Sequence, residues 1–208
     1  MTSHEASPVG VVLAGGGSRR MGRAKANLPF GGGTLLDWMV GLVRQALDEV
    51  WVSVPPAGAP VAGEPIRVPA TASGTLPDVD ALAGPLAALR RALARLERPV
   101  LLVACDLPFL AAEDLRGLAR APRDAEAVVL ADADGPQPVA ALYRPSLLPT
   151  VERILGDRRS AMRDLLGEIA VRSLPATTAH AGCPPLANLN TPEEYAAAVA
   201  KAIARGLF

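Results

Sequence analysis

The chain has 208 residues, half of them apolar, so it can bury a full hydrophobic core, and we expect one domain spanning residues 1–208. Its 21 acidic and 21 basic residues cancel, which argues against a nucleic-acid or membrane-surface binder, because such proteins draw their affinity from excess positive charge. The polar start of the chain and the lack of any run of ~20 apolar residues predict a cytoplasmic protein without an export signal or a membrane span.

The first predicted element is a short buried strand that opens into a glycine-rich, basic turn. The apolar run Val9–Leu13 is followed by glycines at 15 to 17 and by basic side chains that include Arg19, Arg20 and Lys25. Glycines let backbone N–H groups approach a ligand closely, and the basic side chains can neutralise phosphate oxygens. This stretch therefore predicts an anion site suited to a nucleoside triphosphate.

Two better-known phosphate loops do not fit this turn. A Walker loop needs Lys and then Ser or Thr after its last glycine, whereas Gly22 is followed by Arg23 and Ala24. A dinucleotide-binding turn counted from Gly15 would need a third glycine where Arg20 stands. The turn therefore belongs to another kind of nucleotide site.

Downstream of this turn, helical and strand patterns alternate. The aliphatic run at 99–104 is typical of a central parallel strand covered on both faces. Residues 55–77 are rich in proline, glycine and alanine, so we expect an irregular connection with at most one short strand near 66–68. Further strands are expected at 49–54, 127–131, 139–143 and 170–174, and helices at 35–47, 85–96, 113–120, 146–155, 160–168 and 191–205. The alternation predicts an α/β fold, a three-layer αβα sandwich with a Rossmann-like, mostly parallel sheet whose site lies at the carboxyl ends of the strands.

Two of these helices carry start signals. Thr34 can cap the first helix, and Thr191 with Glu194 forms a capping box in which Pro192 takes the first helical position. Both signals predict where the helices begin.

An aspartate directly follows the central aliphatic run. Asp106 stands where an open parallel sheet binds its ligands, and Pro108 stiffens the turn after it. A single carboxylate here suits Mg²⁺, which takes one or two protein carboxylates and completes its shell with water and phosphate. The neighbouring Cys105 is expected to be a small buried residue. Two cysteines and two histidines form no spaced ligand set, so no zinc or iron–sulfur site is expected.

Several motifs together resemble one enzyme family. They are L-A-G-G-x-S-x-R-M-G-x-x-K at 13–25, L-P-F at 28–30, G-T-L-L at 33–36, G-P-L-A-A at 84–88, D-x-P at 106–108 and N-x-N-T-P at 188–192. This set resembles the nucleotidyltransferases that activate sugar phosphates, and most closely the molybdenum cofactor guanylyltransferases. The resemblance implies the fold of the nucleotide-diphospho-sugar transferases, Mg²⁺ as cofactor, and Mg-dependent transfer of GMP from GTP to the phosphate of the molybdopterin-bound molybdenum cofactor.

The resemblance also implies roles for individual residues. Lys25, Asp106 and Arg19 would be catalytic, and Asp106 would hold the metal. The implied nucleotide-binding residues are Leu13, Ala14, Gly15, Gly16, Lys25, Ser53, Asp78, Gly84 and Asp106, with Asp80 as a rival to Asp78. The implied acceptor-binding residues are Arg158, Arg159, Asn188 and Asn190. The N-terminal half would then bind GTP and the C-terminal half the molybdopterin-type cofactor, with transient contact to cofactor-synthesis or client molybdoenzymes.

The chemistry implied needs no protein base, and two alternatives stay open. An acceptor phosphate monoester is largely ionised near neutral pH because its second pKa is ~6, which accounts for the lack of a Ser-His-Asp or Cys-His set. Within the same fold, a cytidylyltransferase or another NTP:phosphate nucleotidyltransferase is the alternative, because Ala88 stands where the family carries a glycine. Outside enzymology, a non-catalytic nucleotide- or cofactor-binding delivery protein is the alternative, which Lys25 and Asp106 disfavour.

Overall fold

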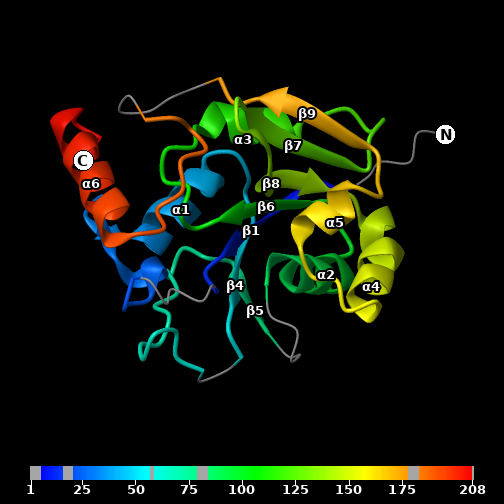
Figure 1. The fold of residues 1–208 in the computed structure, drawn as a ribbon, viewed down its shortest axis with the longest axis horizontal. Coiled ribbons are helices and arrows are strands. Elements are labelled where there is room, and N and C mark those ends of the chain that lie inside the picture. Colours follow the sequence, from blue (N-terminus) through cyan, green and yellow to red (C-terminus); the bar gives the residue numbers. More distant parts are fainter. Residues whose placement is uncertain (1–5, 16–20, 57–58, 79–83, 178–182, 208) are drawn as a thin grey trace.

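One seven-stranded sheet organises the fold. The computed structural model describes residues 6–15, 21–56, 59–78, 84–177 and 183–207. In this part of the chain the sheet order is β5-β4-β1-β6-β8-β7-β9, which runs from bottom to top in Figure 1. Its strands are β1 (Val9–Leu13), β4 (Val50–Val54), β5 (Gly74–Pro77), β6 (Val100–Ala104), β7 (Ala127–Asp132), β8 (Gly135–Tyr143) and β9 (Val171–Pro175). The helices are α1 (Leu35–Arg44), α2 (Pro85–Leu96), α3 (Ala112–Ala119), α4 (Leu148–Gly156), α5 (Met162–Leu166) and α6 (Pro192–Ala204).

The chain reverses its direction of winding at β1. After β1 it adds β4 and β5 on one side and then returns to place β6 on the other, so that Val11 lies opposite both Trp51 and Leu102. The pairs from β5 to β6 are parallel, as is β7 with β9, whereas β8 runs antiparallel to β6 and β7. A reversal of this kind leaves a crevice at the carboxyl ends of the strands. The expectation of a mostly parallel sheet is confirmed.

Alternate residues of the central strands face two separate cores. Val12 and Leu101 pack in the core under α1 and α3, whereas Val11 and Leu102 pack in the core under α2, α4 and α5. Because both faces are covered, these strands consist almost entirely of aliphatic residues, which is why their pattern was clear in the sequence. The expected three-layer αβα sandwich is confirmed.

Both predicted helix caps are confirmed. The Thr34 hydroxyl accepts a hydrogen bond from the backbone N–H of Asp37, and the Asp37 carboxylate accepts one from the backbone N–H of Thr34. Thr191 and Glu194 make the same reciprocal pair, with Pro192 at the first helical position. Each cap contributes roughly 1 kcal/mol and starts its helix at a defined residue.

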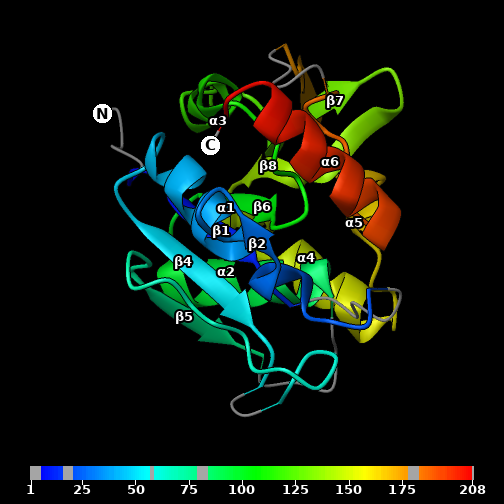
Figure 2. The same ribbon diagram turned by 90° about the vertical axis from the view of Figure 1, so that its left-hand side faces the viewer.

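Helix α6 brings the end of the chain to the turn after β1. It packs beside the short hairpin of β2 (Pro29–Phe30) and β3 (Gly33–Thr34), in a small core that contains Phe30, Phe109 and Leu189. The Tyr195 hydroxyl donates to the carbonyl of Pro29 at 2.5 Å. In Figure 2, α6 lies above and to the right of α1 and β2. This docking positions the segment that precedes α6 so that Asn190 lies beside Lys25.

The connection from 55 to 77 differs from the prediction. The short strand near 66–68 is absent, and the strand instead forms at Gly74–Pro77, where it pairs in parallel with β4. Gly74 is required there because a Cβ would lie 2.5 Å from the Trp51 ring. Strand pairing thus overrides a glycine-proline composition that predicts no strand. The helices expected at 146–155 and 160–168 are also shorter, because a 3-10 turn, Pro145–Leu147, precedes α4 and α5 covers only Met162–Leu166.

No helix within the described part of the chain is both long and apolar enough to cross a membrane.

Candidate active site

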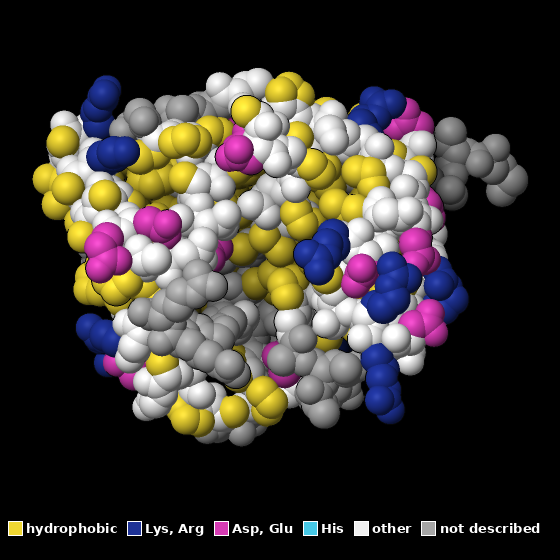
Figure 3. Space-filling view, in the orientation of Figure 1, with side chains coloured by type: hydrophobic (Ala, Val, Ile, Leu, Met, Phe, Trp, Pro, Cys, Tyr) yellow, Lys and Arg dark blue, Asp and Glu magenta, His cyan; other side chains and the backbone are white. Residues whose placement is uncertain are grey.

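A cavity of about 600 Å³ lies at the carboxyl ends of β1, β4, β5 and β6, a volume ordinary for a ligand pocket. Figure 3 shows the face seen in Figure 1 hollowed near its centre, with hydrophobic side chains around the hollow. Eight residues predicted from the sequence line the cavity, namely Leu13, Ala14, Gly15, Lys25, Asp78, Gly84, Asp106 and Asn188. The predicted residues Gly16 and Arg19, and the rival Asp80, lie outside the described residues.

The turn after β1 is anchored to both neighbouring strands. The Ala14 backbone N–H donates to the carbonyl of Ser53 at 3.0 Å, and the Leu13 carbonyl accepts from the N–H of Cys105 at 3.2 Å. These bonds extend the sheet to the edge of the cavity. Ser53 is buried and does not line the cavity, so it supports the turn through its backbone. Its predicted contact with the nucleotide stays a prediction.

Lys25, the last residue of the motif at 13–25, contacts one residue from each of two later motifs. Its Nζ lies 3.0 Å from Oδ2 of Asp106 and 2.9 Å from Oδ1 of Asn190. Only 14% of the Lys25 side chain and 21% of the Asp106 side chain are exposed. Because both side chains are mostly shielded from water, the charge-assisted hydrogen bond between them is stronger than one between surface groups. The three side chains form one polar cluster, of which Lys25 and Asp106 line the cavity, and we call it the lysine cluster.

The lysine cluster is held by backbone contacts on each side. The backbone N–H of Leu189 donates to the carbonyl of Asp106 at 3.0 Å, which ties the segment before α6 to the turn after β6. The Trp38 indole donates to the carbonyl of Pro108 at 2.9 Å and fixes the same turn from α1. The backbone N–H of Asn190 donates to Glu194 at 2.6 Å, so the capping box also orients the residue that contacts Lys25.

A carboxylate and a buried guanidinium meet at the other side of the cavity. Asp78 follows β5, and its backbone N–H donates to the carbonyl of Val54 at 2.9 Å. The Asp78 carboxylate forms an ion pair with Arg91 of α2. Burial lowers the pKa of the Arg91 guanidinium, which nevertheless stays protonated at neutral pH. Arg91 was not predicted as a site residue, although its position two helical turns after Gly84 places it on the helix face that begins at the cavity.

The irregular connection after β4 also contributes to the cavity. Pro55, Pro56 and Val61 line it. Asn27 fixes this connection by donating to the carbonyl of Pro65 at 2.8 Å and accepting from the backbone N–H of Arg67 at 3.0 Å. These residues were not predicted as site residues. A signal was available for the two prolines, because they directly follow a strand that neighbours β1.

The carboxylate of Asp106 fits a magnesium ion. It lines the cavity and is partly exposed, and it is held by a hydrogen bond and ion pair to Lys25, whose ammonium can pair with phosphate oxygens instead. Mg²⁺ needs few protein ligands when phosphate oxygens and water complete its shell. Among the described residues no group of three His, Cys, Asp or Glu side chains is placed to hold a metal ion, so Asp106 would be the main protein ligand.

Cys105 lies beside Asp106 as a protonated thiol. Burial and, to a smaller extent, the neighbouring Asp106 carboxylate raise the pKa of this thiol to about 12. The thiolate, which is the nucleophilic form, is therefore scarce at neutral pH. The expectation that Cys105 is a small buried residue is confirmed.

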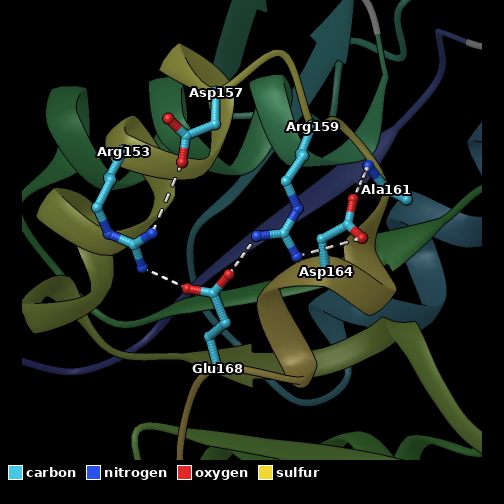
Figure 4. A network of polar contacts seen from close by, with 6 residues as sticks. All are labelled: Arg153, Asp157, Arg159, Ala161, Asp164 and Glu168. Atoms are coloured by element: carbon cyan, nitrogen blue, oxygen red, sulfur yellow. Dashed lines mark hydrogen bonds and ion pairs between the residues drawn. The ribbon is translucent and has the colours of Figure 1, made fainter.

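The two predicted acceptor arginines lie away from the cavity. Arg158 and Arg159 follow the end of α4 and do not line it. Arg159 forms ion pairs with Glu168 and, at 3.5 Å, with Asp164, and Glu168 also pairs with Arg153 (Figure 4). We call these four side chains the α4–α5 network. Arginine donors to the Glu168 carboxylate, first Arg153 and then Arg159, lower its pKa. The acceptor-binding role of Arg158 and Arg159 stays a prediction.

Ala88 lies in the core rather than at the cavity. It lies on the buried face of α2 with Leu89, in the core that also contains Leu13, and it is not part of the cavity lining. The methyl group that distinguishes it from the family glycine therefore fills core space.

The reversal of the sheet at β1, with a cavity at the strand ends beside it, defines the class of nucleotide-binding α/β proteins. Residues 10–174 match the family described as the MobA-like NTP transferase domain. The match covers more than half of the chain, so the chain belongs to this family and is a nucleotidyltransferase.

Similar proteins span nearly the whole chain. A "Probable molybdenum cofactor guanylyltransferase" of Synechococcus elongatus is 33% identical over 197 residues, which are 90% of this chain and 95% of that protein. A protein of the same name from Mycobacterium tuberculosis is 36% identical over 186 residues, 88% of each chain. The crystal structure of Rv0371c from Mycobacterium tuberculosis in complex with manganese matches with a TM-score of 0.69 and 26% identity, over 94% of this chain and 99% of that one.

Proposed function

We propose that this protein transfers GMP from GTP to the phosphate of a molybdopterin-bound molybdenum cofactor and releases pyrophosphate. The observation that carries the proposal is the lysine cluster, in which Lys25 after the glycine-rich turn lies 3.0 Å from Asp106 at the end of β6. The names of the relatives at 33% and 36% identity support guanine as the base and the molybdenum cofactor as the acceptor.

Lys25 and the turn after β1 bind the triphosphate in this proposal. The ammonium of Lys25 can exchange its carboxylate partner for triphosphate oxygens, because it holds Asp106 and Asn190 through hydrogen bonds rather than through packing. Backbone N–H groups of a glycine-rich turn add neutral donors that need no reorientation. Together they offset the negative charge that two phosphate substrates bring into one cavity.

Asp106 would hold a divalent cation, and we propose Mg²⁺. The manganese complex of the structural relative supports the use of a divalent cation. Such a cation, when bound, screens the charge that develops on the transferred phosphate. The lysine cluster keeps the Asp106 carboxylate at the cavity wall and thereby presets its position.

The chemical step follows from the positions of the two anions. An oxygen of the acceptor phosphate attacks the α-phosphorus of GTP in line and forms a new P–O bond, while the bond from the α-phosphorus to the oxygen that bridges to the β-phosphate breaks. Pyrophosphate leaves with that oxygen and its electron pair. The acceptor oxygen is already ionised, so the chain's own task is to position and screen the substrates.

Asn188 and Asn190 connect the proposed acceptor half with the nucleotide half. Asn188 lines the cavity, and the side-chain carbonyl oxygen of Asn190 accepts a hydrogen bond from the Lys25 ammonium. Amide side chains offer both a donor and an acceptor, which suits a phosphate next to a cation. We propose that this segment meets the acceptor phosphate where it approaches the α-phosphorus.

Pyrophosphate release with the molybdopterin-type cofactor and GTP, CTP or ATP at equal concentration tests the proposal. We expect GTP to be favoured by roughly two orders of magnitude, because a pocket that hydrogen-bonds guanine leaves polar groups unpaired with the wrong base, at ~1–3 kcal/mol for each. A preference for CTP would contradict guanylyl transfer within the same fold. Tight GTP binding without pyrophosphate release would identify a delivery protein.

A further inference from the structure

Arg91 differs from the other arginines by its burial and by its partner. Among the described residues, Arg91 and Arg144 are the arginines with less than a tenth of their surface exposed. Arg144 donates to the backbone carbonyls of Ala121 and Pro122 and has a structural part in the fold. Arg91, 8% exposed, instead pairs with the carboxylate of Asp78, which lines the cavity. A buried guanidinium that faces one carboxylate at a ligand cavity calls for a functional explanation.

The fold places this pair at the end of the cavity away from the lysine cluster. Asp78 follows β5 and Asp106 follows β6, and β4 and β1 lie between them in the sheet. Three strand spacings correspond to roughly 14 Å, which is comparable to the span of a nucleotide from its phosphates to its base. Since Lys25 and Asp106 suit the phosphates, the Asp78 end suits the nucleoside. Apolar Pro55, Pro56 and Val61 line the same cavity and can pack against a base.

The two oxygens of the Asp78 carboxylate differ in their surroundings. Oδ1 is buried and faces the Arg91 guanidinium, while 17% of the Asp78 side chain stays exposed at the cavity. The backbone N–H of Asp78 is held by its hydrogen bond to the carbonyl of Val54, so the carboxylate can move only by rotation about the bonds of its own side chain. Arg91 thus holds one oxygen and limits the directions in which the other can point.

We propose that Arg91 is a positioning residue for nucleoside recognition. Its guanidinium holds Oδ1 of Asp78 so that Oδ2 accepts a hydrogen bond from an N–H or O–H donor of the bound nucleoside. The inference rests on the proposed function in that it takes the cavity to bind a nucleoside triphosphate. The donor is the 2-amino group of guanine or the 2′-hydroxyl of the ribose, two groups that share this chemistry.

The positive charge of Arg91 has a second consequence. A lone carboxylate in the cavity would repel the triphosphate through a medium of low dielectric constant. The ion pair makes the nucleoside end of the cavity neutral, and it leaves an acceptor where the nucleoside offers donors. Arg91 thereby lets Asp78 contribute specificity without opposing the binding of an anion.

Calorimetric titration of the full-length protein with GTP, inosine triphosphate and 2′-deoxy-GTP tests the inference without any transfer step. Inosine triphosphate lacks the 2-amino donor and 2′-deoxy-GTP lacks a ribose hydroxyl, so the wild type should bind one of them about tenfold more weakly than GTP. In Arg91→Gln we expect GTP itself to bind about tenfold more weakly and the gap to that analogue to close to within about twofold. Arg91→Lys, which keeps the charge, should recover part of the affinity.

The matched control is Arg95→Gln, one turn later on the same helix at an exposed position, which should bind all three nucleotides like the wild type. Circular dichroism and thermal melting show whether each variant folds. If Arg91→Gln alone fails to fold, Asp78→Asn with and without Arg91→Gln replaces it, because the double variant leaves no unpaired charge. With Asp78 neutralised, removal of Arg91 should change nucleotide affinity by less than about twofold, because positioning acts through Asp78.

Three results would overturn the inference. They are a folded Arg91→Gln protein with wild-type affinity and discrimination, an equal loss of affinity with and without the Asp78 carboxylate, and a wild type that binds no nucleoside triphosphate. If the wild type prefers CTP, guanylyl transfer is wrong, yet the same variants measured with CTP and 2′-deoxy-CTP still decide whether Arg91 acts through Asp78.

Discussion

The lysine cluster and the α4–α5 network consist of similar side chains in different surroundings. Lys25, Asp106 and Asn190 come from three segments that are up to 165 residues apart, and they meet at a cavity. Arg153, Arg159, Asp164 and Glu168 lie within one short stretch of the chain on the surface, where Arg153 is 55% and Arg159 43% exposed. Charge in the sequence therefore does not by itself mark a site.

The physical difference between the two regions is solvation. Water screens the exposed ion pairs and competes for their hydrogen bonds, so such pairs contribute little to stability. Around the lysine cluster, water is partly excluded and each charge acts more strongly on its neighbours and on a bound anion. Removal of one charge should therefore have unequal effects in the two regions.

Asp106→Asn should have the largest effect, because it removes the charge of the proposed metal ligand and keeps the size of the side chain. We expect Mg²⁺-dependent pyrophosphate release to fall by about a thousandfold, which corresponds to the several kcal/mol that a metal ion supplies to such a transition state. Circular dichroism should show an unchanged fold.

The matched control for this variant is Asp157→Asn, at an exposed position of the α4 end that lies 3.8 Å from Arg153. It should keep wild-type activity. Full activity of Asp106→Asn at ordinary Mg²⁺ concentration would exclude Asp106 as the essential metal ligand. It would also show that removing a charge has no larger effect in the lysine cluster than on the surface.

Lys25→Met should have an intermediate effect, on nucleotide binding rather than on folding. The loss of a charge-assisted contact to the triphosphate, ~1.5–3 kcal/mol, weakens GTP binding by about 10- to 100-fold, measured by calorimetric titration. Lys201→Met, at an exposed position of α6, is the control and should bind GTP like the wild type. A Lys25→Met protein that binds GTP normally but melts at a lower temperature would show that the lysine cluster is structural.

Glu168→Gln should have the smallest effect and one that depends on pH. The Arg153 and Arg159 donors lower the pKa of Glu168 below its ordinary 4.5, so the unfolded chain binds more protons than the folded one near this pH. The stabilisation is present above the unfolded pKa and is lost as the pH falls through the lower folded pKa. Activity at pH 7 should stay within about twofold of wild type.

Thermal melting of the wild type and of Glu168→Gln checks the sign of this pH dependence. The wild type should melt slightly above Glu168→Gln at pH 7, and the gap should close as the pH falls below 4.5. A difference in melting temperature that widens toward low pH would contradict the predicted sign. A large loss of transfer activity at pH 7 would show that the α4–α5 network, like the lysine cluster, contributes to the active site.

The framework of this protein and one side of its site could be predicted from local patterns in the chain. Aliphatic runs at β1 and β6 form strands because both faces are buried, and Thr34 and Thr191 start their helices because capping is local. Asp106 and the glycine-rich turn could be assigned to one site because each directly follows a strand, and the carboxyl ends of neighbouring parallel strands meet at one edge.

Which charged residues lie together could not be predicted in this way, because it depends on the packing of separate elements. Arg91 and Arg95 lie one helical turn apart, and nothing local in the sequence distinguishes them. The packing of α2 beside β5 buries Arg91 against Asp78 and leaves Arg95 exposed. Strand β5 exists because β4 offers an edge to pair with, since its own composition does not favour a strand. Burial and long-range contacts depend on how separate elements pack, and local patterns in the chain do not record that packing.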